Sequence, residues 1–184
     1  VGVSLGQFES ISQRESIAKE EDFFNAIKKK YAFEIEIKDK AIENLKEFEE
    51  QLKYNYTFSF KPEDDIIYFT PLLVEAQKNN PFKAEERYYP VELPHTIADT
   101  YILNIETPNG YEIDEIPKST RVKLNESEGM FEYLIAKSEN GIQLRSTIKI
   151  NKANFTNEDY QTLRDFFGYI VKKHAEQIVY KKKK

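Results

Sequence analysis

The side chains that most often carry out covalent catalysis are sparse in this sequence. It contains no cysteine and only two histidines, His95 and His174. A serine or cysteine nucleophile needs an imidazole within hydrogen-bonding reach, and that imidazole needs a third group to fix its tautomer. His95 has no acidic neighbour in its Leu-Pro-His-Thr stretch, and His174 falls on the inward stripe of an expected helix. We therefore interpret both as structural or surface residues and expect no catalytic residue and no metal site.

Acidic side chains are abundant but do not follow the spacing of a known motif. Two clusters, Glu63 to Asp65 and Asn125 to Glu128, could offer oxygen ligands to Ca²⁺. Neither fits the calcium loop of a helix-loop-helix site, so we interpret them as solvated turns. A hydrolase built on dispersed carboxylates is a weaker alternative that would require a concave acidic pocket. The six glycines do not form a phosphate-binding loop, and we expect no cofactor.

The overall charge and composition argue against a nucleic-acid-binding protein and against a membrane-spanning one. The formal net charge is −5, and the basic run Lys181 to Lys184 is too short to form a stripe that grips phosphates. We therefore expect no nucleic-acid partner. No apolar stretch approaches the roughly 18 residues of a membrane-spanning helix, so no transmembrane segment is expected. The 12 tyrosines and 13 phenylalanines can bury enough area for a globular core.

Alternating apolar and polar residues predict several half-buried β-strands. Asn140-Gly141 supplies the positive φ of a tight turn and predicts a β-hairpin over residues 130–150. Pro108 to Gly110 predicts a second turn, which follows a strand at 100–107. The predicted strands lie near residues 33–37, 54–60, 101–105, 111–113, 131–135, 142–150 and 178–180. Residues 66–69 form an apolar run that is too short to assign to a strand or a helix.

Two helices are expected beside these strands. One runs from about Glu15 to Tyr31 and ends in three lysines that complement its negative end. The other follows Thr156, which we expect to accept a hydrogen bond from the amide of Asp159, and ends near Ala175. A further short helix is expected near 71–77.

These elements predict an α+β fold that is mainly antiparallel β. We expect sandwich-like sheets with a long C-terminal helix and an N-terminal helix packed on them, because the turns are too short for crossover connections. The cluster of breakers and charges near residues 79–87 divides the chain into an α+β subdomain at 1–86 and an antiparallel subdomain at 87–184. The two could also form one continuous domain.

One segment resembles a known family. Residues 80–91, Asn-Pro-Phe-Lys-Ala-Glu-Glu-Arg-Tyr-Tyr-Pro-Val, are similar to a signature of the domain that follows the catalytic core in bacterial transglutaminase-like proteins. This domain has no assigned function. The resemblance continues in stretches that together cover nearly the whole chain, and loosely before about residue 50. These stretches are 54–60, 67–73, 108–113, 116–119, 159–167 and 175–179.

The resemblance implies a domain that lies beside a papain-like catalytic core in the same polypeptide, in the envelope or periplasm of Gram-negative bacteria or secreted. The family's Cys-His-Asp triad cannot be carried over, since this chain has no cysteine. The resemblance thus implies a non-catalytic accessory domain that packs beside the core or positions its partners.

Within the signature, Arg87, Tyr88 and Tyr89 are the candidate binding residues. They could line a recognition surface for a peptide or a glycan, because exposed aromatic clusters tend to mark interfaces. The simpler interpretation is a structural bend that joins the two halves. A glycan- or peptide-binding β-module is therefore the alternative to the accessory domain, and exposure of these three side chains is the observation that separates a surface from a bend.

Overall fold

The computed structural model describes residues 1–6, 10–17, 19–31 and 34–183. Its largest element is a seven-stranded sheet in which all neighbouring strands are antiparallel. In spatial order its strands are β2 (Glu36–Glu43), β3 (Leu52–Ser59), β1 (Gly2–Leu5), β6 (Ile97–Glu106), β10 (Gly141–Ile150), β9 (Gly129–Lys137) and β8 (Thr120–Lys123).

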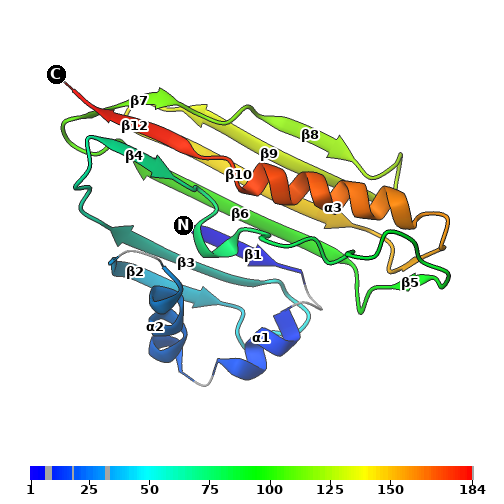
Figure 1. The fold of residues 1–184 in the computed structure, drawn as a ribbon. Helices are drawn as coiled ribbons and strands as arrows, with labels where there is room; N and C mark the ends of the chain where they lie inside the picture. The colour runs from blue at the N-terminus through cyan, green and yellow to red at the C-terminus, as the bar shows by residue number, and fades with distance from the viewer. Residues whose placement is uncertain (7–9, 18, 32–33, 184) are drawn as a thin grey trace.

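Two smaller antiparallel sheets and three α-helices complete the described fold. One small sheet contains β4 (Ile66–Phe69), β12 (Ile178–Lys182) and β7 (Tyr111–Glu115), and the other pairs β11 (Asn154–Phe155) with β5 (Val91–Glu92). The helices are α1 (Ser10–Ser16), α2 (Glu20–Lys30) and α3 (Tyr160–His174), and η1 (Leu73–Glu75) is a 3-10 turn. In Figure 1, α3 and β12 run along one face of the large sheet, while α1 and α2 lie at its β2–β3 end.

The structure confirms the predicted antiparallel α+β class and its strongest local features. β9 and β10 pair from Gly129–Ile150 to Lys137–Ile142, which is the predicted hairpin. Gly110 turns the chain after β6 with φ = 83°, a conformation that glycine adopts without a Cβ clash. The strand after this turn, β7, pairs with β12 in the small sheet rather than with β6.

The structure confirms the predicted N-terminal helix as α2, but its predicted start at Glu15 is wrong. Two helices occupy this region, and Lys19 precedes the second with an extended backbone at φ −140° and ψ 136°. The first turn of α2 carries Glu20, Glu21 and Asp22, whose charges favour the positive end of a new helix. This acidic triplet is the sequence signal for the break.

Three smaller expectations also need correction. The amide of Asp159 donates to Thr156 as predicted, but to its carbonyl oxygen at 3.2 Å. The Thr156 hydroxyl is instead a donor: it and the Thr156 amide donate to the Asp159 carboxylate at 2.9 and 3.0 Å, because an ionised carboxylate is a strong acceptor. The short helix near 71–77 is the single 3-10 turn η1, where Leu73 has φ = 52° and cannot continue an α-helix. The strand expected at 33–37 begins at Glu36, and Phe33 lies outside the described residues.

A single hydrophobic core joins both halves of the chain. It combines Tyr54 and Tyr56 of β3 with Phe131 of β9 and Ile170 of α3. The large sheet takes β1, β2 and β3 from residues 1–86 and its other four strands from 87–184. The boundary between the two predicted subdomains stays a prediction.

Candidate functional site

The first half of the signature segment is anchored on α3. The side chain of Asn80 donates to the Arg164 carbonyl at 2.8 Å and accepts from the amide of Phe82 at 2.9 Å. Phe82 is buried, and its ring meets Tyr160 edge-on with centroids 5.9 Å apart. The Tyr160 hydroxyl donates to the Ala84 carbonyl at 2.8 Å. These contacts explain the Asn-Pro-Phe residues as a structural clamp.

The second half of the segment displays its side chains to solvent. Tyr88 is 81% exposed and Tyr89 is 78% exposed. Arg87 is also exposed, and its Nε donates to the Tyr89 carbonyl at 3.2 Å. The chain becomes buried again at Val91 in β5. The three predicted residues therefore form one exposed turn, which we call the tyrosine turn (Arg87 to Tyr89), held at both ends by buried residues.

The buried histidine lies beside a serine, and such a pair can act as base and nucleophile when its geometry is suitable. His174 is 2% exposed and Ser146 is 4% exposed. The Ser146 Oγ lies 3.2 Å from His174 Nε2, and the amide of Gln77 donates to His174 Nδ1 at 3.0 Å. The ring of Phe131 packs against the imidazole at 5.4 Å. The histidine thus contacts strands β9 and β10 on one side and residue 77 on the other.

This tautomer prevents His174 from acting as a general base toward Ser146. Because Nδ1 accepts the Gln77 amide proton, a neutral imidazole carries its own proton on Nε2 and donates it to the serine hydroxyl. A serine-activating histidine requires the opposite arrangement, with a lone pair on the nitrogen that faces the hydroxyl. Burial lowers the pKa of His174 to about 4, so the ring stays neutral at pH 7. The pair satisfies two buried polar groups and does not form a nucleophile.

The segment of residues 70–78 runs over the large sheet and separates two hollows. Buried hydroxyls fix it there: Tyr101 donates to the Pro71 carbonyl at 2.7 Å, and Tyr54 donates to the Glu75 carboxylate at 2.9 Å. Burial raises the pKa of Glu75, and the Tyr54 hydrogen bond opposes that rise. The His174 contact with Gln77 fixes the end of the segment.

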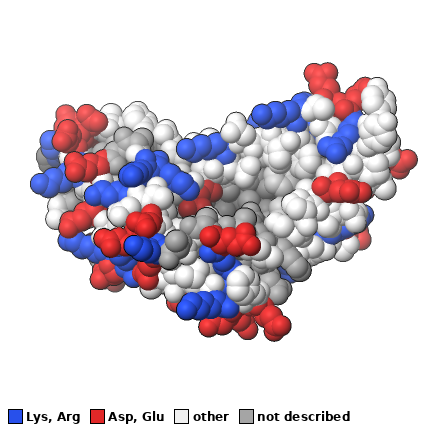
Figure 2. Space-filling view, turned by 90° about the horizontal axis from the view of Figure 1, so that it is seen from below, with Lys and Arg blue, Asp and Glu red and all other residues white. Residues whose placement is uncertain are grey.

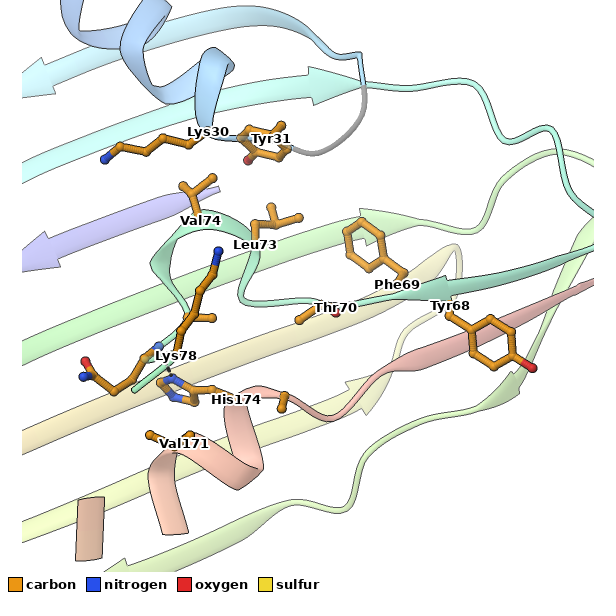
Figure 3. A pocket seen from close by; sticks show the side chains of 13 residues that line it. Lys30, Tyr31, Tyr68, Phe69, Thr70, Leu73, Val74, Lys78, Val171 and His174 are labelled. Atoms are coloured by element: carbon orange, nitrogen blue, oxygen red, sulfur yellow. Dashed lines mark hydrogen bonds between the residues drawn. The ribbon is translucent and has the colours of Figure 1, made fainter. Parts of the chain in front are cut away.

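The two hollows differ in chemistry. One, which we call the polar cavity, has a volume of about 320 Å³ and contains Glu75, Asp99, Ser146 and His174 in its wall. The other, the apolar cavity, has a volume of about 500 Å³ and lies between the end of α2, the 70–78 segment and the end of α3. Figure 3 shows the apolar cavity, with His174 at the side nearest α3. Both volumes lie in the range that small ligands occupy.

The remaining predicted candidates lie apart from these cavities. His95 is half-buried, and its Nδ1 lies 2.9 Å from the Thr96 carbonyl. Glu128 pairs with Lys152 at 2.6 Å, and Asp65 pairs with Lys182 at 3.1 Å. Within residues 1–6, 10–17, 19–31 and 34–183, no three acidic, histidine or cysteine side chains converge as a metal site. One carboxylate of each acidic cluster thus pairs with a lysine.

Two contacts of buried polar residues were not predicted from the sequence. The pairing of His174 with Ser146 could have been inferred, because His174 falls on an inward stripe and buried polar groups require partners. Arg14 had no such signal. It is 5% exposed, donates to the Asn44 and Glu50 carbonyls, and lies 5.5 Å from the Phe48 ring centroid. These partners of the buried charge come from the distant loop at 44–50.

The distribution of surface charge and the polarity of the helices are those expected from the composition. In the view from below, basic and acidic side chains are interspersed, and the outline is hollowed between two lobes (Figure 2). Among the described helices, none combines the length and apolarity needed to cross a bilayer.

Comparisons with known proteins place the chain in a family. A crystal structure described as "a putative protease from Parabacteroides distasonis" superposes with a TM-score of 0.46 at 18% identity, over 54% of this chain and 19% of that chain. Among curated proteins, none matches. The model of a domain family of unknown function, DUF3858, matches residues 65–180, and this range contains the tyrosine turn, the 70–78 segment and α3. Since the match covers more than half of the sequence, the chain belongs to the DUF3858 family.

Proposed function

We propose that this chain is a non-catalytic accessory domain of a transglutaminase-like envelope protein, and that the tyrosine turn is its contact with the catalytic core. The observation that carries the proposal is the exposure of Tyr88 and Tyr89 on a segment whose flanks are clamped. Rigid, exposed tyrosines give large contact area at a small entropic cost, as in many interface hot spots. The core would precede this domain in the same polypeptide, in the periplasm or cell envelope.

The chemistry of the buried histidine supports the non-catalytic part of this proposal. His174 donates to Ser146 and cannot accept its proton in this tautomer. Glu75 and Asp99 line the polar cavity together with His174, but the Nδ1 position is occupied by the Gln77 amide and not by an acid. An amidase or transamidase activity of the isolated chain, insensitive to thiol reagents, would contradict the proposal.

The contact surface is tested by binding between this chain and the separately produced core of the full-length protein. We expect Tyr88→Ala and Tyr89→Ala each to weaken the complex by about tenfold or more, because a hot-spot tyrosine contributes about 1.4 kcal/mol or more. Tyr68→Ala is the matched control, since Tyr68 is 64% exposed on β4, away from the turn. Equal affinities for all three variants would show that the turn is not the contact.

A glycan- or peptide-binding module is the second candidate, and the same exposed rings favour it. Sugar rings and extended peptides both stack on tyrosine faces that project from a rigid turn. Panels of envelope glycans and peptides distinguish the two candidates. Binding to a panel that is lost in Tyr88→Ala, with no binding to the core, would favour the module over the accessory domain.

A further inference from the structure

The apolar cavity combines an aliphatic interior with free positive charges at its edge. Leu73, Val74 and Val171 line it from the 70–78 segment and from α3. Lys30, at the end of α2, and Lys78, at the end of the 70–78 segment, also line the cavity (Figure 3). An interior of this kind excludes water, while the ammonium groups at the edge attract an anion.

The two lysines are available to a ligand. Both side chains are exposed. Neither ammonium group makes a hydrogen bond or an ion pair with any part of the chain that the structure describes. The charge of Lys30 acts to lower the pKa of Glu75. The Glu75 carboxylate, however, accepts a hydrogen bond from Tyr54 and lies in the wall of the polar cavity. Two lysines whose ammonium groups have no partner among the described residues therefore line one hollow.

Two polar side chains that line the cavity, His174 and Thr70, already have hydrogen-bond partners. Both ring nitrogens of His174 have partners, and the Thr70 hydroxyl lies 3.4 Å from the side-chain amide of Gln177, which donates to it. The interior thus offers a ligand little hydrogen bonding, so an apolar group fits it better than a sugar or a peptide backbone. Recognition must come from burial of a chain and from charge at the edge.

We propose that the apolar cavity binds a single-chain amphiphilic carboxylate, such as a medium-chain fatty acid, with its head group at Lys30 and Lys78 and its chain along Leu73, Val74 and Val171. A volume of about 500 Å³ accommodates a chain of moderate length, within the range of small-ligand sites. Burial of each added methylene strengthens binding by roughly fourfold. This site is independent of the tyrosine turn and of any contact with a catalytic core.

Titration of the 184-residue chain with hexanoate, octanoate and decanoate, followed by calorimetry and amide chemical shifts, tests the apolar half of the site. Affinity should rise roughly fourfold per methylene, and the shifted amides should include the 70–78 segment and the end of α3. An affinity that does not change with chain length would overturn the proposal, because a surface ion pair does not sense the chain.

The preference of the site for one head-group charge tests the role of the two lysines. Octanoate should bind at least several-fold more tightly than octanol, and octylammonium should bind more weakly than octanol, because two fixed ammonium groups face the head group. Added salt should reduce the preference for octanoate over octanol. Equal binding of the three head groups would overturn the proposed role of the lysines.

Single substitutions locate the head group with a built-in control. Lys30→Gln and Lys78→Gln should each weaken octanoate several-fold while leaving octanol unchanged. Lys29→Gln removes the same charge one residue away on α2, at a position outside the cavity lining, and should leave octanoate affinity near that of the wild type. If Lys29→Gln weakens octanoate as much as Lys30→Gln does, the head group is held by diffuse charge and the proposed site is wrong.

Discussion

The buried His174 makes the stability of the fold depend on pH in a defined direction. Burial lowers its pKa from the ordinary 6.5 to about 4. As the pH falls through 6.5 the unfolded chain takes up a proton, while the folded chain does so only near pH 4. The contribution of His174 is therefore complete above about pH 6.5 and is lost between that pH and about pH 4.

The size of this contribution follows from the difference between the two pKa values. Each tenfold change in a protonation equilibrium corresponds to about 1.4 kcal/mol, so the neutral His174 contributes about 3 kcal/mol at pH 7. The side chain is 2% exposed, and solvent screening reduces this value little. Within a typical stability of about 5–15 kcal/mol, such a loss is readily measured.

The perturbation is His174→Gln, which removes the titrating ring but keeps a side chain that can hydrogen-bond to Ser146. Urea unfolding of both proteins, followed by circular dichroism at several pH values between about pH 7 and pH 4, gives the free energy of unfolding. The wild type should lose about 3 kcal/mol more than the variant over this range, although the variant starts lower because it loses packing on Phe131. Carboxylates, including Glu75, titrate in both proteins and cancel in the comparison.

His95→Gln is the matched control, because it removes the other imidazole from a half-buried loop. It shows how far the loss of an imidazole elsewhere in the chain changes the pH dependence. Parallel stability curves for the wild type and His174→Gln would refute the reasoning, since they would show that the proton on His174 does not distinguish the folded from the unfolded chain.

Two further predictions concern the large sheet. Phe131→Ala should cost about 3–5 kcal/mol in thermal or urea unfolding, because this ring is 0% exposed. Leu134→Ala, on the opposite face of β9 at 39% exposed, should cost less, and equal losses would contradict the assignment of the two faces. Gly141→Ala should prevent normal pairing of β10 with β6, because a Cβ would lie 2.0 Å from the Ile105 carbonyl oxygen; an unchanged unfolding midpoint would contradict this close approach.

Local sequence determined much of the secondary structure. The β9–β10 hairpin follows from alternating side chains around Asn140-Gly141, and α3 with its closing strand follows from one apolar stripe. The break between α1 and α2 was missed because apolar residues on both sides of it suggested a continuous helix, although the acidic start of α2 marked it. Periodicity predicts the type of an element better than its ends, since the ends depend on individual backbone contacts.

The signature segment shows a similar division. Its sequence selected Arg87, Tyr88 and Tyr89 as candidates, but alternation alone gave no reason to separate them from Phe82. Contacts with α3, almost 80 residues later in the chain, bury Phe82 and leave the two tyrosines exposed. The exposure of a side chain depends on the segments that pack against it. The residues next to it in the sequence do not show which segments these are.

By itself, the sequence determined that the chain forms an antiparallel α+β domain, and the missing cysteine removed the thiol chemistry of the family that it resembles. The tertiary structure alone decided that His174 meets Ser146 in a tautomer unsuited to proton abstraction, and that Lys30 and Lys78 line one apolar cavity. The physical reason is the separation along the sequence over which each kind of interaction acts. Strand and turn preferences act between residues a few positions apart, whereas hydrogen-bond partners and cavities depend on contacts between segments distant in the chain.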